Sequence, residues 1–159
     1  MKRKTRTSPM NVLNVYESFK KIPFGKSLFS FLTCTQAPYF HSIRPLVQEL
    51  SAGYCEVSIK ERRRVRNHIN TIHAIALCNI CELSMGLAVE SKIPKQLRWL
   101  PKGMNVEYKS VGKGKLTGVC DIRNMELKAG EQHVVVNVLN EQKQLVTRAT
   151  IILHVTEKR

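Results

Sequence analysis

The sequence predicts an α+β fold in which an antiparallel β-sheet wraps around one long central helix. Residues 72–89 are almost entirely apolar or small over the length of a helix, and a helix that is apolar on nearly all faces is a buried one. After this helix, runs rich in β-branched residues indicate four strands, at residues 104–110, 115–123, 133–140 and 144–155. A sheet with one apolar face needs a cover. The central helix is the only long apolar element, so we expect the sheet to wrap around it.

Two shorter helices are expected before the sheet. In residues 10–21 apolar side chains recur at helical spacing until Pro23, and residues 25–34 carry a second apolar cluster. Residues 10–36 would then form an N-terminal helical extension of a single domain that spans residues 10–159. The extension either closes over a ligand tunnel as a lid or simply covers a hydrophobic edge of the sheet.

The first nine residues are basic and polar, and we expect residues 1–9 to be a flexible tail. A secretory signal would need an adjacent apolar run of about 7 to 15 residues, and no such run follows the tail. We therefore expect a cytoplasmic protein.

Short extended segments and turns surround the central helix. Strands are expected at residues 46–50 and 53–60, the second with alternating polar and apolar side chains. Residues 91–102, with two prolines and the only tryptophan, are expected to form a connecting loop. The Gly-Lys-Gly sequence at 112–114 indicates a turn between the first two of the four later strands. A polar Glu-Gln-Lys turn joins the last two strands into a long hairpin.

Glu82 stands in the middle of the apolar helix, where a carboxylate without a partner is costly to bury. Either it serves a functional site, or its face of the helix is open to solvent or paired with a basic residue. A membrane span is disfavoured, because the apolar run is short and a central acidic residue costs about 2.5 to 3.5 kcal/mol on insertion scales.

Helix geometry separates His73 from Glu82. At about 100° per residue, nine residues place the two side chains on opposite sides of the helix and roughly 13 Å apart along its axis. Asn79, three residues before Glu82, shares its face. If the helix start and Glu82 belong to one active site, a second copy of the chain has to supply one of them. We therefore expect a homodimer, or a dimer of such dimers.

Charge and cysteine content limit the classes of partner. A formal net charge of +14 over 159 residues suggests an anionic partner such as nucleic acid, a membrane surface or a phosphorylated small molecule. Nucleic acid is disfavoured, because only 6% of the residues are aromatic and the basic residues are spread along the chain. The odd number of cysteines argues against a disulfide framework, and Cys78 and Cys81 have no second pair at zinc-site spacing. We expect no metal and no cofactor.

The segment from Asn67 to Glu82, NHINTIHAIALCNICE, resembles the signature of hotdog-fold thioesterases of the phenylacetate-pathway type. That signature has an Asn, a Gly three residues later, His-Gly-Gly, and an acidic residue nine positions after the His. The segments APYFHSIRPLV, RRRVRNH and LRWLPKGMNVEY resemble a sub-branch of hotdog proteins more closely. The resemblance covers roughly residues 37–155. It implies the hotdog fold and an acyl-CoA thioesterase activity.

The resemblance also implies roles at the helix start. Thioester hydrolysis needs a base or nucleophile, and donors for the oxyanion that develops. Glu82 would take the first role, while the Ala74 N–H and the Asn67 side chain would polarise the carbonyl or position water. His73 would act in catalysis or only hydrogen bond at the helix start. Ala74 and Ile75 replace the Gly-Gly of the signature; Ala74 can still offer its amide, because the first N–H groups of a helix have no internal partner. Ile75 is expected to narrow the pocket.

Further candidates concern the substrate, an acyl-CoA or another acyl thioester. Asn70, which stands where the signature often has Gly, and Asn79 are candidates for substrate binding. Candidates for contact with the coenzyme A phosphates are Arg62, Arg63, Arg64 and Lys113; alternatively, the basic run is a solvated strand end. Because of the Ala74-Ile75 replacement, a non-catalytic hotdog protein that binds acyl-CoA or a protein partner remains the alternative to a hydrolase.

Overall fold

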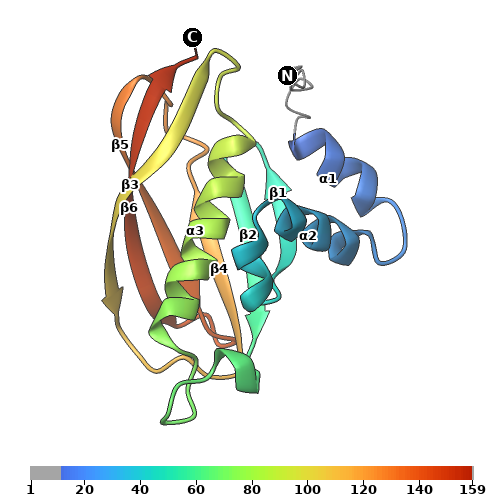
Figure 1. Cartoon of the computed structure of the whole chain (residues 1–159), viewed down its shortest axis with the longest axis vertical. Helices are drawn as coiled ribbons and strands as arrows, with labels where there is room; N and C mark the ends of the chain where they lie inside the picture. Colours follow the sequence, from blue (N-terminus) through green and yellow to red (C-terminus); the bar gives the residue numbers. More distant parts are fainter. Residues whose placement is uncertain (1–11, 159) are drawn as a thin grey trace, which may run out of the picture.

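The computed structural model describes residues 12–158, which form an antiparallel sheet wrapped around one long helix, α3 (Figure 1). The predicted tail of residues 1–9 lies outside this range. The helices are α1 (Val12–Lys20), α2 (Gly25–Gln36) and α3 (Ala74–Glu90), with 3₁₀ turns at Pro38–Ser42 and Arg63–Val65. The strands are β1 (Leu46–Ser51), β2 (Tyr54–Lys60), β3 (Leu97–Tyr108), β4 (Lys115–Asp121), β5 (Gly130–Leu139) and β6 (Leu145–Glu157). No helix of the described part is long and apolar enough to cross a membrane.

The six strands form one sheet in the order β1-β2-β4-β5-β6-β3, and every neighbouring pair is antiparallel. Alternate residues of β2, β4, β5 and β6 point toward α3, so their apolar side chains meet the helix in one core. Ile80 and Met85 of α3 are fully buried there, as are Val57, Leu116 and Ile151 of the sheet. The predicted arrangement of sheet and central helix is confirmed.

α3 is buried on most sides but not on all. Ile75, Glu82 and Glu90 are exposed, with Cys78 and Gly86 partly exposed between them. These positions are three or four residues apart, so they form one stripe along the helix. The sheet covers the other faces and leaves this stripe open, which means that Glu82 is not buried as an isolated charge. The structure thus shows an open helix face at Glu82, and an open face also leaves this carboxylate accessible to a ligand.

The segment predicted as a loop at 91–102 is in large part strand, because β3 begins at Leu97 and pairs with β6 as far as Glu157. The prolines suggested a loop, but the strand accommodates Pro101 at a bulge between Pro101 and Gly103. β3 is an edge strand, where a residue without an N–H leaves no ladder hydrogen bond unmade. Pairing with the long strand β6 therefore outweighed the preference of the prolines for a loop.

The turn predicted at 112–114 does not join neighbouring strands. β3 and β4 lie at different places in the sheet, and the connection between them passes the start of α3. There the Ile72 N–H donates to the Gly112 carbonyl at 2.8 Å. A Cβ on Gly112 would stand 3.2 Å from Leu116 and 3.4 Å from Ile72, so this close passage suits glycine.

The helical extension packs against the outer strand β1. Tyr16 of α1 and Phe29 of α2 are buried and meet edge to face, with ring centroids 5.1 Å apart. The Tyr16 hydroxyl donates to the Gln48 carbonyl at 3.0 Å, and burial raises its pKa. The Val47 N–H donates to the Ser30 hydroxyl at 2.8 Å. The extension thus covers the β1 edge of the sheet, which is one of the two roles that the sequence suggested for it.

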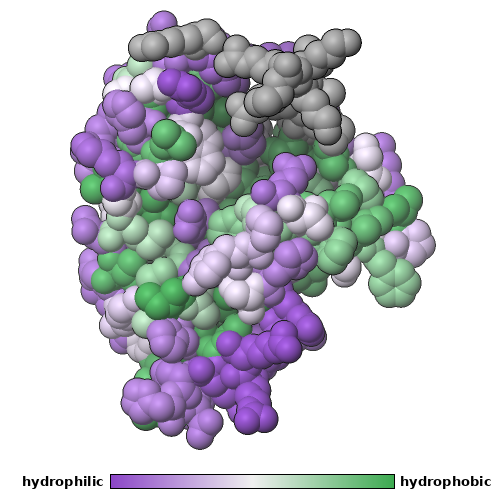
Figure 2. All heavy atoms as spheres, viewed as in Figure 1, coloured by the Kyte–Doolittle hydropathy of each residue, from purple (hydrophilic) through white to green (hydrophobic). Residues whose placement is uncertain are grey.

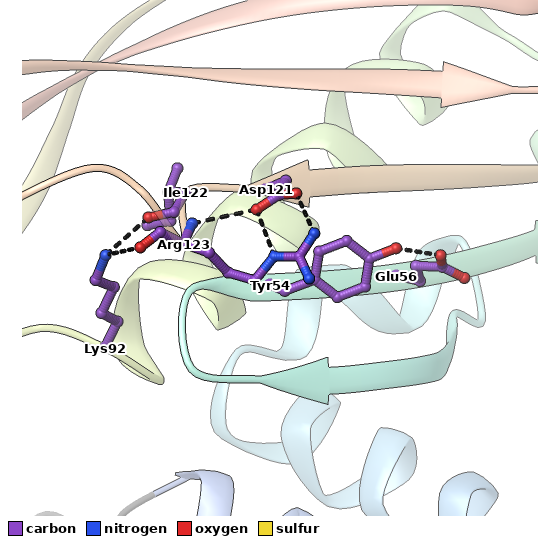
Figure 3. A network of polar contacts seen from close by, with 6 residues as sticks. All are labelled: Tyr54, Glu56, Lys92, Asp121, Ile122 and Arg123. Carbon is purple, nitrogen blue, oxygen red and sulfur yellow. Dashed lines mark hydrogen bonds and ion pairs between the residues drawn. The ribbon is translucent and has the colours of Figure 1, made fainter.

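The far end of α3 is tied to the loop after β4 by Lys92 (Figure 3). Its Nζ donates to the backbone carbonyls of Ile122, Arg123 and Met125 at 2.9, 2.7 and 2.6 Å. In the same network the Arg123 guanidinium forms a 2.6 Å ion pair with Asp121 and stacks on the Tyr54 ring. Burial, followed by the hydrogen bond to Glu56, raises the pKa of Tyr54. We infer a structural role for these groups, because they join β2, β4 and the helix end.

Candidate functional site

A large apolar groove lies between the helical extension and the open stripe of α3. Its volume is about 1010 Å³. Val12 and Val15 of α1, Phe29 and Leu32 of α2, and Leu83 and Leu87 of α3 line it, together with Trp99 of β3. Figure 2 shows the apolar surface of the extension beside this region. The extension therefore also closes one side of a groove, so the two roles proposed for it are compatible.

Glu82 lies on the wall of this groove. Among residues 12–158, no side chain forms an ion pair or hydrogen bond with its carboxylate. The second carboxylate of the groove, Glu90, is held differently, because it accepts a hydrogen bond from Trp99 Nε1 at 3.1 Å. Gly86 lies between the two acidic residues, and because it has no side chain, it leaves room in the groove at this point of the helix. An unpaired carboxylate next to an apolar groove is available to a substrate or to a water molecule.

The start of α3 presents one backbone donor. The Ile75 N–H donates to His73 Nδ1 at 3.0 Å, so His73 caps the helix. The N–H groups of Ala76 and Leu77 donate to the His73 carbonyl. Within the described chain, the Ala74 N–H has no acceptor. It is therefore the free amide at the positive end of the helix dipole, as the sequence predicts for this position.

The polar groups of Asn67 are used in its own loop. Its Oδ1 accepts hydrogen bonds from the N–H groups of Ile69 and Thr71 at 3.1 and 3.0 Å, and its Nδ2 donates to Thr71 Oγ1 at 2.8 Å. Asn70 has φ = 59°, a left-handed conformation that glycine and asparagine adopt most readily. This explains why asparagine can replace the glycine of the signature. Both side chains shape the loop that leads into α3.

Asn79 is buried one turn before Glu82. Its Nδ2 donates to Ser42 Oγ at 3.1 Å, while its Oδ1 has no hydrogen-bond partner among the described residues. A buried acceptor without a donor costs about 1 to 3 kcal/mol. Asn79 is not among the residues that line the groove, so its Oδ1 is a buried acceptor beside the site rather than a group on the groove wall.

The basic residues near the helix start fall into two groups. Arg62 donates from Nη2 to the Ile43 carbonyl at 2.6 Å, and burial, followed by the nearby charges of Arg44 and Arg64, lowers its pKa. Arg63 and Arg64 are exposed. Lys113 instead stands near Glu61, whose pKa is lowered first by the Gly114 N–H and then by Arg66 and Lys113. Arg62, Arg44 and Arg64, which we call the arginine group, thus bring positive charges close together. Lys113 instead lies near the carboxylate of Glu61.

A single chain does not bring all candidate residues together. Asn67, Asn70, His73, Ala74 and the arginines lie around the start of α3, whereas Asn79 and Glu82 lie at mid-helix. Eight residues separate Ala74 from Glu82, or about 12 Å along the axis. The sequence analysis missed the groove residues Gly86, Glu90 and Trp99. The spacing of Glu82, Gly86 and Glu90 at every fourth position was the available signal.

The family model described as "Domain of unknown function (DUF4442)" matches residues 25–155. The chain belongs to the DUF4442 family. Among solved structures, this DUF4442 chain is similar to the genomics target APC5556 with a TM-score of 0.83 and 36% identity, over 92% of this chain and 99% of that one. No curated protein matches it.

Two more distant structures share the fold. The Pseudomonas aeruginosa protein PA5026, described as a probable thioesterase, has a TM-score of 0.73 and 18% identity, over 86% of the DUF4442 chain and 97% of its own. The Haemophilus influenzae thioesterase HI1161 has a TM-score of 0.67 and 13% identity, over 75% and 82%. The predicted hotdog fold is thereby confirmed.

Proposed function

We propose that this DUF4442 protein hydrolyses an acyl thioester, with acyl-CoA as the substrate class. The observation that carries the proposal is the unpaired carboxylate of Glu82 on the wall of an apolar groove large enough for an acyl chain. Proteins of the same fold that are described as thioesterases give the reaction type. The groove offers apolar contacts to the acyl chain, and Glu82 stands where the thioester end would lie.

In the proposed reaction, the Glu82 carboxylate takes a proton from water as the water oxygen attacks the acyl carbon, or attacks that carbon directly. A backbone N–H donates to the developing oxyanion, which then collapses and breaks the C–S bond. In the water route, the departing thiolate takes up the proton that Glu82 accepted, and the acid is released. In the direct route, loss of the thiolate leaves an anhydride between Glu82 and the acyl group. A water molecule then hydrolyses this anhydride, which releases the acid, regenerates the Glu82 carboxylate and supplies the proton for the thiolate. A positioned base contributes about 10² to 10⁴ in rate, and one oxyanion donor about 10² to 10³.

The oxyanion donor is proposed to come from a second copy of the chain. The free Ala74 N–H is about 12 Å along the helix from Glu82 of the same chain, which is too far for one carbonyl to reach both. A homodimer that places α3 helices side by side would bring Ala74 of one copy to Glu82 of the other. The uncovered stripe of α3 and the uncovered edge of β3 are the surfaces available for such pairing.

The arginine group offers a site for the phosphates of coenzyme A. Arg62, Arg64 and Arg44 gather positive charge close to the start of α3, and the lowered pKa of Arg62 reflects this crowding and its burial. A polyanion bound there would relieve the repulsion between the guanidinium groups. Lys113 is less suited to this role because Glu61 lies next to it.

A non-catalytic acyl-CoA-binding protein is the second candidate. Ile75 is 54% exposed directly after the free amide of Ala74. A branched side chain there stands where the signature has glycine, and in the second candidate it would obstruct access to the amide. In that case the groove and the arginine group would bind acyl-CoA without hydrolysing it.

The experiment is a turnover assay of the purified protein on acyl-CoAs of increasing chain length. We expect Glu82→Gln to lower kcat at least about 100-fold while the thermal unfolding midpoint stays unchanged. Glu141→Gln, at an exposed hairpin turn, is the matched control and should keep wild-type turnover. Equal turnover by Glu82→Gln would contradict the role of Glu82. Acyl-CoA binding by the wild type without any hydrolysis would establish the second candidate.

A further inference from the structure

The turn between α1 and α2 presents a group of apolar side chains to solvent. Phe24 is 88% exposed, Phe31 57%, Ile22 49% and Leu28 44%. We call these four residues the tip. In Figure 1 the turn projects on the side of the molecule opposite β5 and β6, and in Figure 2 apolar residues reach the outer end of this projection.

The backbone enforces this exposure. Phe24 has φ = 58° and ψ = 10°, an uncommon left-handed conformation for a bulky residue, and it directly precedes α2. The next residue, Gly25, is packed so tightly that an added Cβ would stand 1.6 Å from the Phe19 carbonyl oxygen. The turn is therefore fixed with the Phe24 ring outward. Strain of this kind persists where the surrounding structure fixes it, and it is typical of functional positions.

The tip continues along one face of α2. Leu28 and Phe31 follow Phe24 at four and seven residues, which is the spacing of a single helical face. The opposite face of α2 carries Phe29 and Ser30, both buried against the rest of the protein. On the outer face, the Phe31 ring meets the His41 ring edge to face at 5.4 Å, and both Phe31 and Leu28 stay about half exposed. Ordinary core packing thus accounts for one face of α2 and leaves large apolar side chains on the other.

Positive charge surrounds the tip. Lys20 and Lys21 immediately precede it; Lys20 forms a 3.6 Å ion pair with Glu17 on the exposed face of α1. Lys26 follows Phe24 in the sequence, but its Nζ donates to the Gln48 carbonyl of β1 at 2.6 Å. Among the described residues up to Leu32, there are three basic side chains and one acidic side chain, Glu17. Aromatic and aliphatic groups bordered by lysines are the composition of elements that lie in the interface of an anionic bilayer. A second copy of the chain fits less well, because the same lysines would repel each other.

We propose that the tip docks onto an anionic lipid surface, with Phe24 inserted among the acyl chains and Lys20 and Lys21 near the headgroups. The tip is convex, a shape that can enter a deformable lipid layer but offers little area to a rigid protein. The same two helices line the groove with their inner faces. Docking therefore places the groove wall close to the lipid surface, and this inference does not depend on hydrolysis taking place in the groove.

The test is co-sedimentation of the full chain with phosphatidylcholine vesicles that contain phosphatidylglycerol, compared with vesicles of phosphatidylcholine alone. We expect binding to the anionic vesicles that weakens as salt is added. Phe24→Ser should weaken this binding about tenfold, and the Phe24→Ser/Phe31→Ser variant more. Lys20→Glu/Lys21→Glu should remove the preference for anionic vesicles. Leu100→Ser, a 66% exposed leucine outside the tip, is the matched control and should bind like the wild type.

Circular dichroism and the thermal unfolding midpoint show whether each variant keeps its fold. Exposed side chains are replaced, so unchanged folding is expected. Three results would overturn the proposal: no binding of the wild type to anionic vesicles, equal binding of the Phe24→Ser and wild-type proteins, or equal binding to both vesicle types. Dissociation of a solution oligomer by Phe24→Ser, without lipid binding by the wild type, would assign the tip to contact between copies.

Discussion

His73 illustrates how a residue in a catalytic-looking motif can have a local structural task. Its Nδ1 accepts the Ile75 N–H at 3.0 Å and so satisfies one of the first amides of α3. Because His73 occupies one amide and its carbonyl takes two more, the Ala74 N–H is left as the free donor. The residue would then prepare the oxyanion donor rather than move a proton.

We predict that His73→Ala lowers the free energy of unfolding by about 1 kcal/mol, the usual cost of losing a helix cap. His73→Asn keeps an acceptor at the same position, so it should retain most of the stability and most of the turnover. Urea unfolding curves and the acyl-CoA assay measure the two effects. If His73→Asn folds with wild-type stability and yet loses turnover about 100-fold or more, His73 acts as a proton carrier instead.

At the scale of the element, β3 is the part of the sheet that lacks a neighbour. The opposite edge strand, β1, is covered by the helical extension, whereas the other edge of β3 meets no strand within residues 12–158. The Lys109 N–H donates to the Val146 carbonyl of β6. In an antiparallel pair, every second residue of a strand bonds to its neighbour, so from Gly103 to Lys109 the residues at odd positions point their N–H groups toward β6 and those at even positions point them away. On this alternation the N–H of Val106 points away from β6. An edge twelve residues long invites pairing with another chain.

We predict that Val106→Pro weakens the dimer at least about tenfold while the protomer remains folded. Proline removes the outward N–H and is tolerated on an edge strand, because no hydrogen bond to β6 is lost. Val106→Thr keeps the N–H and the branched shape and is the matched control. Sedimentation equilibrium measures the dissociation constant, and circular dichroism checks the fold. An unchanged dissociation constant for Val106→Pro would exclude this edge as the interface.

At the scale of the whole molecule, the distribution of candidate residues argues for a shared site. The start of α3 carries the free amide and the arginine group, whereas the groove with Glu82 lies farther along the helix. In the proposed site, one protomer would therefore hold two incomplete halves. Two-fold pairing makes two complete sites from four halves, since the same surface of each copy meets the other.

A mixing experiment tests this arrangement. The inactive variants are Glu82→Gln, which removes the carboxylate, and Ala74→Pro, which removes the free N–H at a first helical position that tolerates proline. Refolded together, they should form heterodimers that regain one intact site of two, and hence about half of the wild-type turnover per heterodimer. Mass spectrometry of tagged chains confirms the heterodimers. Confirmed heterodimers without any recovered turnover would show that the two residues act within one chain.

The sequence by itself determined that a sheet wraps around a central helix and in which order the elements follow, and its resemblance to hotdog-fold thioesterases implied the hotdog fold. Its signals were local: the apolar run at 72–89, the alternation at 53–60 and the β-branched runs of the last strands. The free amide of Ala74 also followed from the sequence, because every helix leaves its first N–H groups without internal partners. These features depend on neighbours along the chain, so a pattern of residues is enough to predict them.

Only the tertiary structure decided which side of α3 stays open and which residues from other elements line the groove beside it. Glu82 is exposed because the sheet does not cover its stripe. The spacing of Glu82, Gly86 and Glu90 marks one face of the helix, but in a nearly uniform apolar helix this spacing does not determine which face the sheet leaves open. Trp99 lines the groove because pairing with β6 outweighed the prolines that favoured a loop. Both outcomes depend on contacts between segments far apart in sequence. Long-range packing supplies the free energy for them, and a local pattern does not encode it.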